Sequence, residues 1–156
     1  MIEFTSGDMF AQPFDIRINT VNCVGVMGRG IALAFKNRYP AMFKAYKMEC
    51  DLENIKPGEL FVWKGKSTYP PKDADCHVVN LPTKRHWRDN SRYEDVEAGL
   101  KALRKYLEPL GSVTVALPAL GCGCGGLNWE KVSAMISREM DGLKAEITVF
   151  SPADSR

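Results

Sequence analysis

At 156 residues the chain has the length of one domain, and its 45% hydrophobic and 26% charged residues are ordinary for a globular protein. The formal net charge of +2 is too small for total charge alone to indicate a nucleic-acid binder. No apolar run approaches the ~20 residues of a membrane span, and the first eight residues lack the basic start and apolar block of a signal peptide. We therefore expect no membrane partner.

The cysteines indicate a reduced, cytoplasmic protein. Their number is odd and their spacing irregular: Cys23, Cys50, Cys76, Cys122 and Cys124. Cys122 and Cys124 form a Cys-x-Cys pair rather than Cys-x-x-Cys, and no second ligand pair follows. His77 and His86 are the only histidines. We expect neither a metal site nor a cofactor.

The first third of the chain predicts two strands followed by two helices. Residues 2–5 and 14–19 alternate apolar and polar side chains, as strands do. A first glycine loop, residues 19–30, then leads into helical spacing over residues 31–39. Pro40 ends that helix or opens the next one, residues 41–50.

The middle of the chain predicts a short strand at residues 60–63 and a surface hairpin or loop at 64–75. Residues 76–81 are almost continuously apolar, which is typical of a buried strand. A basic loop, residues 83–92, follows, and residues 93–107 have the spacing of an amphipathic helix.

The last third predicts a strand from Val113, a second glycine loop at residues 118–127, a helix at 128–140 and a strand at 146–150. Strands thus alternate with helices through most of the chain. This order predicts an α/β fold, a three-layer α/β/α sandwich around a mixed, largely parallel sheet. Because ligands of such sheets bind at the carboxyl ends of strands, we expect the turn at Asp8 and the three loops to converge on one crevice.

The second glycine loop has four glycines in the six residues 121–126, between a strand and a helix start. Glycines let a backbone approach an anion, and the N–H groups at a helix start point toward it. The alternative is a tight turn without a ligand, although four glycines cost more entropy than a turn requires. Two glycine loops, each leading into a helix, suit the two phosphates of a pyrophosphate.

A Rossmann dinucleotide site is the competing interpretation, since residues 121–126 satisfy Gly-x-Gly-x-x-Gly. That fold requires the pattern early in a βαβ unit, with an acidic residue at the end of the next strand. Here only one helix and one strand follow the pattern, and the first glycine loop lacks it. The sequence therefore disfavours a Rossmann site.

Several segments together carry a family resemblance: Gly7-Asp8, residues 18–22 leading into 25–32, Pro118-Ala-Leu-Gly-Cys-Gly123, and Ile147-Thr-Val-Phe150. In this order they resemble a macrodomain, the ADP-ribose-binding fold, over essentially the whole chain. The similarity is closest to the DarG antitoxins, through residues 22–36, 81–88 and 121–129. These antitoxins are partners of DarT, a toxin that ADP-ribosylates thymidine in DNA.

The resemblance implies a set of ADP-ribose-binding residues: Asp8, Met9, Thr20, Val21, Asn22, Gly28, Arg29, Gly30, Ile31, Thr83, Pro118, Ala119, Leu120, Gly121, Cys122, Gly123, Cys124, Gly125, Gly126, Leu127 and Phe150. Asp8 would accept from the adenine amine, although a turn aspartate is the ordinary alternative. Phe150 would pack on the adenine or belong to the core. Asn22 would bind the distal ribose or cap its loop.

Lys84 is the catalytic candidate that the resemblance implies, in the loop expected to lie over the distal ribose. It would act as an acid or cation that stabilises the departing base, or as a nucleophile that attacks C1″. The related terminal ADP-ribose protein glycohydrolase shares this lysine and also uses an aspartate where this chain has Gly125. A lysine–aspartate mechanism therefore does not transfer directly.

The basic loop indicates the substrate. Arg85, His86, Trp87 and Arg88 place cations and an aromatic ring beside Lys84, as expected for contact with DNA backbone and an unpaired base. Lys64, Lys66 and Lys72 are expected to extend that face. A solvated loop, partly neutralised by nearby acidic residues, is the simpler alternative.

Three functions follow from these observations. The first is an ADP-ribosyl glycohydrolase that removes ADP-ribose from thymidine in single-stranded DNA and reverses a toxin. The second is an ADP-ribose-binding module without turnover, which the missing aspartate at position 125 favours. The third is a hydrolase of ADP-ribosyl esters on protein acidic residues. We also expect residues 1–156 to be a single macrodomain from the N-terminal part of a longer antitoxin, whose C-terminal region contacts the toxin.

Overall fold

The computed structural model describes residues 1–68 and 70–152 of the chain. These residues form strands and helices in the order β1 (Ile2–Thr5), β2 (Ile16–Val21), α1 (Gly30–Arg38), α2 (Pro40–Asp51), β3 (Phe61–Lys66), β4 (Asp75–Pro82), α3 (Tyr93–Leu107), a short 3₁₀ helix η1 (Glu108–Leu110), β5 (Thr114–Leu117), α4 (Trp129–Glu139) and β6 (Glu146–Phe150). Every predicted strand and helix is present, and α3 and β6 have the predicted bounds.

The strands form one sheet in the order β1-β6-β5-β2-β4-β3. All neighbouring strands are parallel except β3, which pairs with β4 in the antiparallel direction. The predicted mixed, largely parallel sheet is therefore confirmed. β3 is longer than predicted because Lys64 to Lys66 continue the pairing, opposite Asp75 to His77. The sequence predicted a surface hairpin or loop after residue 63, and the β3–β4 pairing bears out the hairpin. Its first residues pair as strand although their polar side chains hide the strand pattern on an exposed edge.

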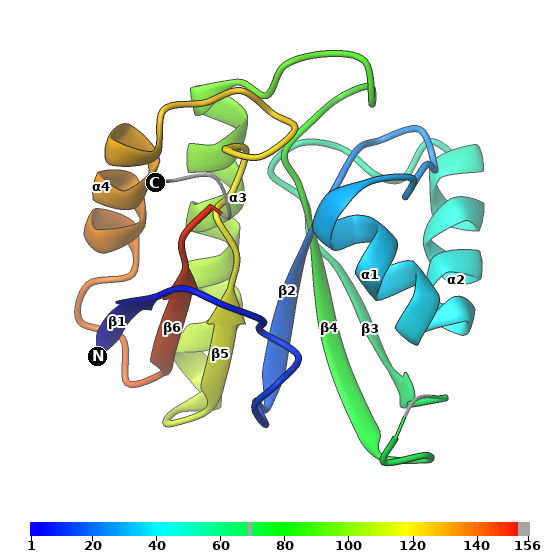
Figure 1. The fold of residues 1–156 in the computed structure, drawn as a ribbon. Coiled ribbons are helices and arrows are strands. Elements are labelled where there is room, and N and C mark those ends of the chain that lie inside the picture. The colour runs from blue at the N-terminus through cyan, green and yellow to red at the C-terminus, as the bar shows by residue number, and fades with distance from the viewer. Residues whose placement is uncertain (69, 153–156) are drawn as a thin grey trace.

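Helices cover both faces of the sheet, as Figure 1 shows. Helices α1 and α2 pack together on one face, while α3 and α4 pack together on the other. The three-layer α/β/α arrangement is thus confirmed. Two separate clusters of buried apolar side chains result, one between the sheet and each pair of helices.

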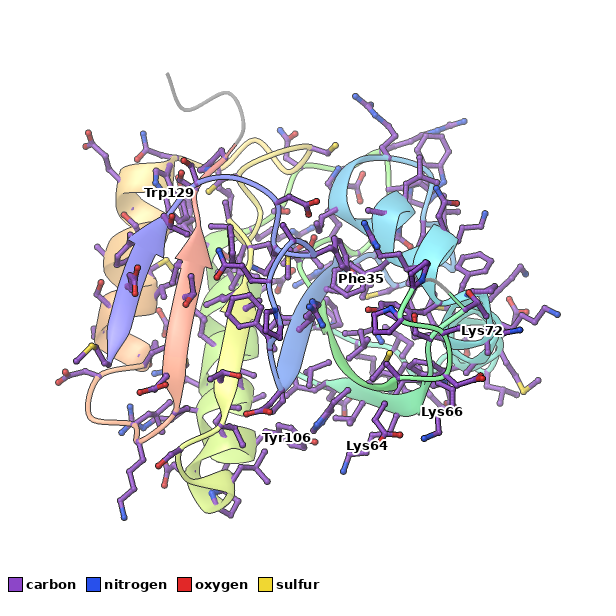
Figure 2. The ribbon with its side chains drawn as sticks, turned by 60° about the horizontal axis from the view of Figure 1, so that its bottom comes forward. Phe35, Lys64, Lys66, Lys72, Tyr106 and Trp129 are labelled. Atoms are coloured by element: carbon purple, nitrogen blue, oxygen red, sulfur yellow. The ribbon has the colours of Figure 1, made fainter. Side chains whose placement is uncertain are left out.

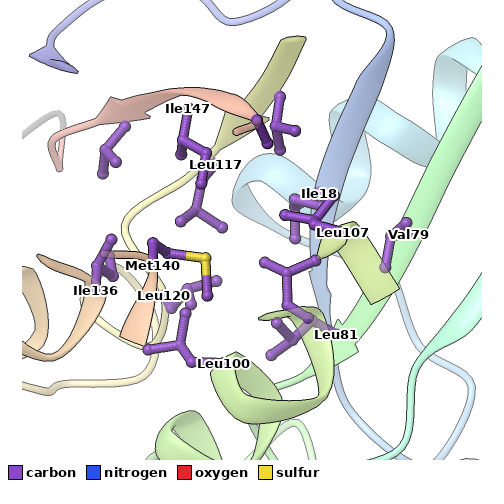
Figure 3. Packing of buried hydrophobic residues seen from close by; sticks show 14 of the residues in the cluster. Ile18, Val79, Leu81, Leu100, Leu107, Leu117, Leu120, Ile136, Met140 and Ile147 are labelled. Carbon is purple, nitrogen blue, oxygen red and sulfur yellow. The ribbon is translucent and has the colours of Figure 1, made fainter. Parts of the chain in front are cut away.

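The larger cluster lies under α3 and α4 (Figure 3). Leu100, Leu103 and Leu107 recur along one side of α3 and pack in the same cluster as the strand residue Val79. Val78, which precedes Val79 on β4, belongs to the opposite cluster because successive side chains of a strand point to opposite faces. Apolar spacing of 3.6 residues in the helices and two in the strands therefore builds this core.

The carboxyl ends of the parallel strands place several loops at one edge of the sheet, the upper edge in Figure 1. The first glycine loop follows β2, the basic loop follows β4, and the second glycine loop follows β5. Because β3 is antiparallel to β4, the start of β3 and the α2–β3 connection lie at this edge as well. The loops thus meet at one edge of the sheet, as predicted.

The lysines of the β3–β4 hairpin lie at the opposite edge (Figure 2). Lys64 pairs with His77 and Lys66 with Asp75, at the start of β4, whereas the basic loop follows the end of that strand. The expectation that Lys64, Lys66 and Lys72 extend the basic face is wrong. The antiparallel direction of β3 is the physical reason, since it carries the hairpin away from the strand ends.

Candidate functional site

The two glycine loops meet between the carboxyl ends of β2 and β5. A methyl group placed on Gly30 would lie 3.9 Å from Sγ of Cys124. Gly30, Gly121 and Gly126 have φ values of 59°, 71° and 77°, a region that glycine adopts without strain. The first loop leads into α1 at Gly30, and the second into α4 at Trp129. The start of α1 and two glycine-rich backbones at one place favour an anionic ligand.

Backbone hydrogen bonds fix the second glycine loop. Leu127 N donates to Gly121 O at 2.9 Å, and Cys122 N donates to Ala119 O at 3.1 Å. Leu120 and Pro118 are buried, so the loop leaves the sheet through the core. Burial raises the pKa of the Cys122 thiol to about 11, which keeps it protonated at neutral pH.

Gly125 is closely surrounded. A methyl group on it would lie 2.3 Å from Ser91 Oγ and 2.4 Å from Gly121 O. Ser91 N also donates to Gly125 O at 2.9 Å, which joins the end of the basic loop to the second glycine loop. No side chain fits at position 125 in this arrangement, so the absence of aspartate there has a steric cause.

Asn22 organises the first glycine loop. Its Oδ1 accepts from Val24 N at 3.1 Å and Val26 N at 3.3 Å, and its Nδ2 donates to Val26 O at 2.7 Å. The Tyr46 hydroxyl, on α2, lies 2.9 Å from the same Oδ1 and 2.7 Å from Asn22 O. Burial raises the pKa of Tyr46, so the hydroxyl remains a donor. The sequence indicated the capping role of Asn22 as an alternative, but gave no signal for Tyr46.

Lys84 is carried by a continuation of the β2–β4 pairing beyond the strand ends. Thr83 N donates to Val21 O at 2.9 Å, and Cys23 N donates to Arg85 O at 3.3 Å. The Cys23 thiol also donates to Lys84 O at 3.5 Å. The pKa of this thiol is raised to about 11, mainly by burial, so its proton is retained. The backbone of Lys84 is therefore fixed beside the first glycine loop.

The side chain of Lys84 is partly exposed, and its Nζ donates to the backbone carbonyl of Trp87 at 3.2 Å. An amine on a fixed backbone, tethered by one hydrogen bond at the edge of the crevice, is free to turn toward a ligand when that bond is exchanged. This arrangement fits a group that contacts substrate.

Arg85 has a partner inside the protein. Its Nε and one terminal nitrogen each lie 3.1 Å from an oxygen of Asp95, on the first turn of α3. Asp95 is only 4% exposed, so this paired, bidentate contact neutralises a carboxylate that burial would otherwise disfavour. The sequence grouped Arg85 with the DNA-contacting cations, whereas in the structure its guanidinium anchors the basic loop to α3.

His86, Trp87 and Arg88 form a surface cluster in which His86 is half-buried and the other two are exposed. The His86 and Trp87 rings are 5.3 Å apart at 30°, and the Arg88 guanidinium lies 4.7 Å from the Trp87 ring centre. Trp87 is 44% exposed. A large aromatic ring held in solvent by a cation and an imidazole is a surface to which an unpaired base can stack.

The family to which this chain belongs is decided by its sequence. The sequence matches the Macro domain family over residues 18–136. The chain belongs to the macrodomain family. The match includes both glycine loops and the basic loop.

Among curated relatives, this macrodomain is 46% identical over 132 residues to the DNA ADP-ribosyl glycohydrolase of Mycobacterium tuberculosis, covering 85% of this chain and 36% of that protein. It is 38% identical to the DNA ADP-ribosyl glycohydrolase of Thermus aquaticus, over 99% of this chain and 42% of the relative. The chain thus spans less than half the length of these curated relatives.

Among solved structures, the macrodomain of Mycobacterium tuberculosis DarG superposes with a TM-score of 0.88 at 38% identity, covering 98% of this chain and 99% of the other. Thermosipho africanus DarTG in complex with ADP-ribose superposes with a TM-score of 0.89 at 29% identity, covering 99% and 42%. The predicted resemblance to DarG macrodomains is therefore confirmed.

At one end of the macrodomain's sheet lie β1 and β6. Asp8, just after β1, is exposed, and its Oδ1 accepts from Phe10 N at 2.8 Å, as in an ordinary aspartate turn. Met9 is buried, and Phe150, at the end of β6, is 5% exposed with its ring edge-on to Phe14 at 6.0 Å. Phe150 therefore belongs largely to the core beneath the crevice.

Arg17 is a residue that sequence reasoning missed. Its guanidinium donates to Met9 O at 3.3 Å and Gln12 O at 2.6 Å, which fixes the turn that carries Asp8. It also lies 5.7 and 5.8 Å from the ring centres of Phe10 and Phe14. Nothing in the strand pattern of residues 14–19 marks this arginine, because its partners come from the preceding turn.

The remaining predicted residues lie along the same edge. Thr20 and Val21 end β2, Arg29 precedes α1, and Gly28 and Ile31 flank that helix start. Within residues 1–68 and 70–152, no group of three histidine, cysteine or acidic residues is placed to hold a metal ion. In the same part of the chain, none of the helices combines the length and apolar character needed to cross a bilayer.

Proposed function

We propose that this macrodomain is a DNA ADP-ribosyl glycohydrolase that removes ADP-ribose from thymidine in single-stranded DNA. The position of Lys84 carries the proposal: the lysine lies at the carboxyl end of β4, beside the first glycine loop and next to an exposed cluster of cations and aromatic rings. The names of the relatives, DNA ADP-ribosyl glycohydrolases of two bacteria, support the same activity.

The order of the strands suggests how ADP-ribose lies in the crevice. Adenine would occupy the β1–β6 end, near Asp8 and the edge of Phe150. The pyrophosphate would lie between the glycine loops, close to the start of α1. The distal ribose would then reach Asn22 and Lys84, between β2 and β4. The Thermosipho africanus DarTG complex, which contains ADP-ribose, is consistent with a ligand of this kind in the fold.

The reaction hydrolyses the bond between ribose C1″ and a thymine ring nitrogen. The nitrogen leaves with the bonding electrons and takes a proton, and the hydroxyl of water adds to C1″. Lys84 would supply that proton, or stabilise the departing base by its charge. Alternatively its amine would attack C1″, the thymine nitrogen would leave with the bonding electrons and take up the proton that the amine loses, and water would then hydrolyse the lysyl adduct of the opened sugar. Both routes use the same side chain.

The substrate would be single-stranded or have its base extruded, because a modified base inside a duplex is hard to reach. His86, Trp87 and Arg88 offer stacking and charge to such a strand. Arg85 would contribute indirectly, by holding the loop through Asp95.

Two other functions compete with this one. A binding module without turnover is favoured by Gly125, since the lysine–aspartate pair of the terminal ADP-ribose protein glycohydrolase is incomplete here. A hydrolase of ADP-ribosyl esters on protein acidic residues would use the same crevice. Incubating the protein with ADP-ribosylated single-stranded DNA and with glutamate-ADP-ribosylated protein, side by side, distinguishes them. We expect free ADP-ribose from the DNA; release only from the protein, or from neither, would overturn the proposal.

We also propose that residues 1–156 form the macrodomain of a longer, cytoplasmic antitoxin that opposes a DarT-type toxin. The chain spans 36% of its Mycobacterium tuberculosis relative, which supports a larger protein. All five cysteines are unpaired, as expected in a reducing compartment. Contact with the toxin would use a region outside these residues.

A further inference from the structure

A groove lies between the first glycine loop and the residues that follow α2. Cys23 and Val24 of the first glycine loop form one wall, and Cys50 with residues 52–56, after α2, form the other. Its volume is about 760 Å³, within the range of sites that hold small organic ligands. Neither the glycine loops' anion site nor the exposed Trp87 cluster uses this space.

The groove continues the crevice in the direction in which ADP-ribose would run. The sheet order β6-β5-β2-β4-β3 leads from the adenine end, past the glycine loops, to Lys84 and then to β3. Because β3 is antiparallel, its start and the preceding residues 52–60 lie at the same edge as the strand ends. A group attached to C1″ at Lys84 and pointing onward would therefore enter this groove.

Cys23 connects the groove to Lys84 directly. The residue lines the groove, its thiol donates to Lys84 O at 3.5 Å, and its N–H donates to Arg85 O at 3.3 Å. The wall of the groove and the backbone of Lys84 are thus adjacent, with no intervening element.

The lining has the mixed character that an unpaired nucleotide requires. Val24 and Leu52 are 43% and 63% exposed, so their apolar surfaces are available to the faces of a base. Glu53 and the amide oxygen of Asn54 present polar groups for base edges, while the Asn54 amide nitrogen donates to Glu49 Oε2 at 2.8 Å. Lys56 supplies a cation for a phosphate. The two charged residues offset one another, which suits one nucleotide better than a long stretch of backbone.

We propose that this groove binds the nucleotide adjacent to the modified thymidine in single-stranded DNA. The inference rests on the proposed function and adds to it a subsite for the flanking base and its phosphate. The enzyme would then recognise the DNA strand as well as ADP-ribose, and its turnover would depend on the presence of the neighbouring nucleotide.

The test compares two substrates: ADP-ribosyl-thymidine as a free nucleoside, and the same modification inside a short single-stranded oligonucleotide. We expect Leu52→Glu and Lys56→Glu each to lower kcat/KM for the oligonucleotide by about tenfold, the loss associated with one base or phosphate contact. Their kcat/KM for the nucleoside should stay within about twofold of the wild type, since the nucleoside does not reach the groove.

Matched controls come from the opposite edge of the molecule. Leu110→Glu, after α3, and Lys64→Glu, on β3, make the same chemical changes at exposed positions. They should leave kcat/KM unchanged for both the oligonucleotide and the nucleoside. If the groove variants lower kcat/KM equally for both substrates, or lower it for neither, the proposed subsite is wrong.

A second readout separates this proposal from the first. Fluorescence anisotropy of an unmodified single-stranded oligonucleotide measures DNA binding without turnover. Weaker binding by the groove variants than by their controls would support the subsite even if the wild type hydrolyses neither substrate, an outcome that defeats only the proposed function. Binding lost in Trp87→Ala but unchanged in the groove variants would show that the strand follows the Trp87 cluster instead.

Discussion

Gly125 shows how one residue sets the chemistry available to the crevice. The space that an aspartate would need is filled by Ser91 Oγ and Gly121 O, which lie 2.3 and 2.4 Å from the point where its Cβ would stand. The proposed hydrolysis therefore has to use Lys84 without a carboxylate at this position.

Introducing the missing group should harm the protein rather than help it. We expect Gly125→Asp to lower the free energy of unfolding by about 2–3 kcal/mol, as overpacking does, and to lower Tm by roughly 5–10 °C. ADP-ribose affinity should fall with it, because the second glycine loop must shift. Gly123→Asp is the matched control in the same loop, since nothing lies within 4 Å of that position. Equal decreases in Tm for Gly125→Asp and Gly123→Asp would contradict this explanation.

Arg85 and Asp95 act as one unit at the residue scale. Both Arg85→Ala and Asp95→Asn break the bidentate pair that holds the basic loop on α3. We expect each to lower kcat about tenfold with little change in KM, and the double variant to be no worse than the more damaged single one. Additive losses would show that the two residues work independently.

The salt dependence of DNA binding shows which cations of the basic loop contact DNA phosphates. Arg88→Ala should reduce the slope of log affinity against log salt by about 0.7, the value for one phosphate contact on a single strand. Arg85→Ala should leave that slope unchanged, because its guanidinium is committed to Asp95. A reduced slope for Arg85→Ala would restore the sequence-based assignment of this residue to DNA.

At the scale of elements, β4 and α3 are joined by a polar contact as well as by the core. His77 Nε2 lies 2.6 Å from the Tyr106 hydroxyl, with the rings edge-on at 5.8 Å. Burial, and then the charge of Lys64, lower the pKa of His77 below its ordinary value. The folded protein therefore binds a proton at this site less readily than the unfolded chain does.

A depressed histidine pKa fixes the sign of a pH effect. The stability that neutral His77 contributes is complete above the unfolded pKa of about 6.5, and is lost as pH falls through the folded pKa. In urea unfolding, the free energy of unfolding should fall more between pH 7 and pH 5 for the wild type than for His77→Gln. Lys101 lowers the pKa of Glu139, so the contribution of Glu139 to stability changes at a more acidic pH than the range from pH 7 to pH 5. Equal losses in the two proteins would exclude His77 as the cause.

At the scale of the whole molecule, the sequence predicted the fold well because the main signals are local. Period-two strands, period-3.6 helices and glycine loops define nearly every element, and parallel strand ends bring the loops to one edge. The family resemblance added the expected roles of Lys84 and Asn22. The hairpin alternative at residues 64–75 implies an antiparallel β3, and that direction places Lys64, Lys66 and Lys72 at the edge opposite the basic loop, against the expectation drawn from their charge alone.

The contacts that hold the site together were also beyond the sequence. Tyr46 reaches Asn22 across 24 residues, Cys23 reaches the Lys84 carbonyl across 61, and Arg17 holds the Asp8 turn. Each depends on where two separate elements meet, and no spacing along the chain encodes that. The same holds for Ser91, whose position under the second glycine loop excludes a side chain at 125.

In the proposed function, Lys84 drives hydrolysis of ADP-ribosyl-thymidine in DNA. The most direct measurement is release of free ADP-ribose from a thymidine-ADP-ribosylated single-stranded oligonucleotide by the wild type and by Lys84→Ala, with ADP-ribose binding followed by calorimetry. We predict release by the wild type and at least about a hundredfold slower release by the variant, with binding of ADP-ribose retained. No release by a wild type that still binds ADP-ribose, or equal release by both proteins, would contradict the account.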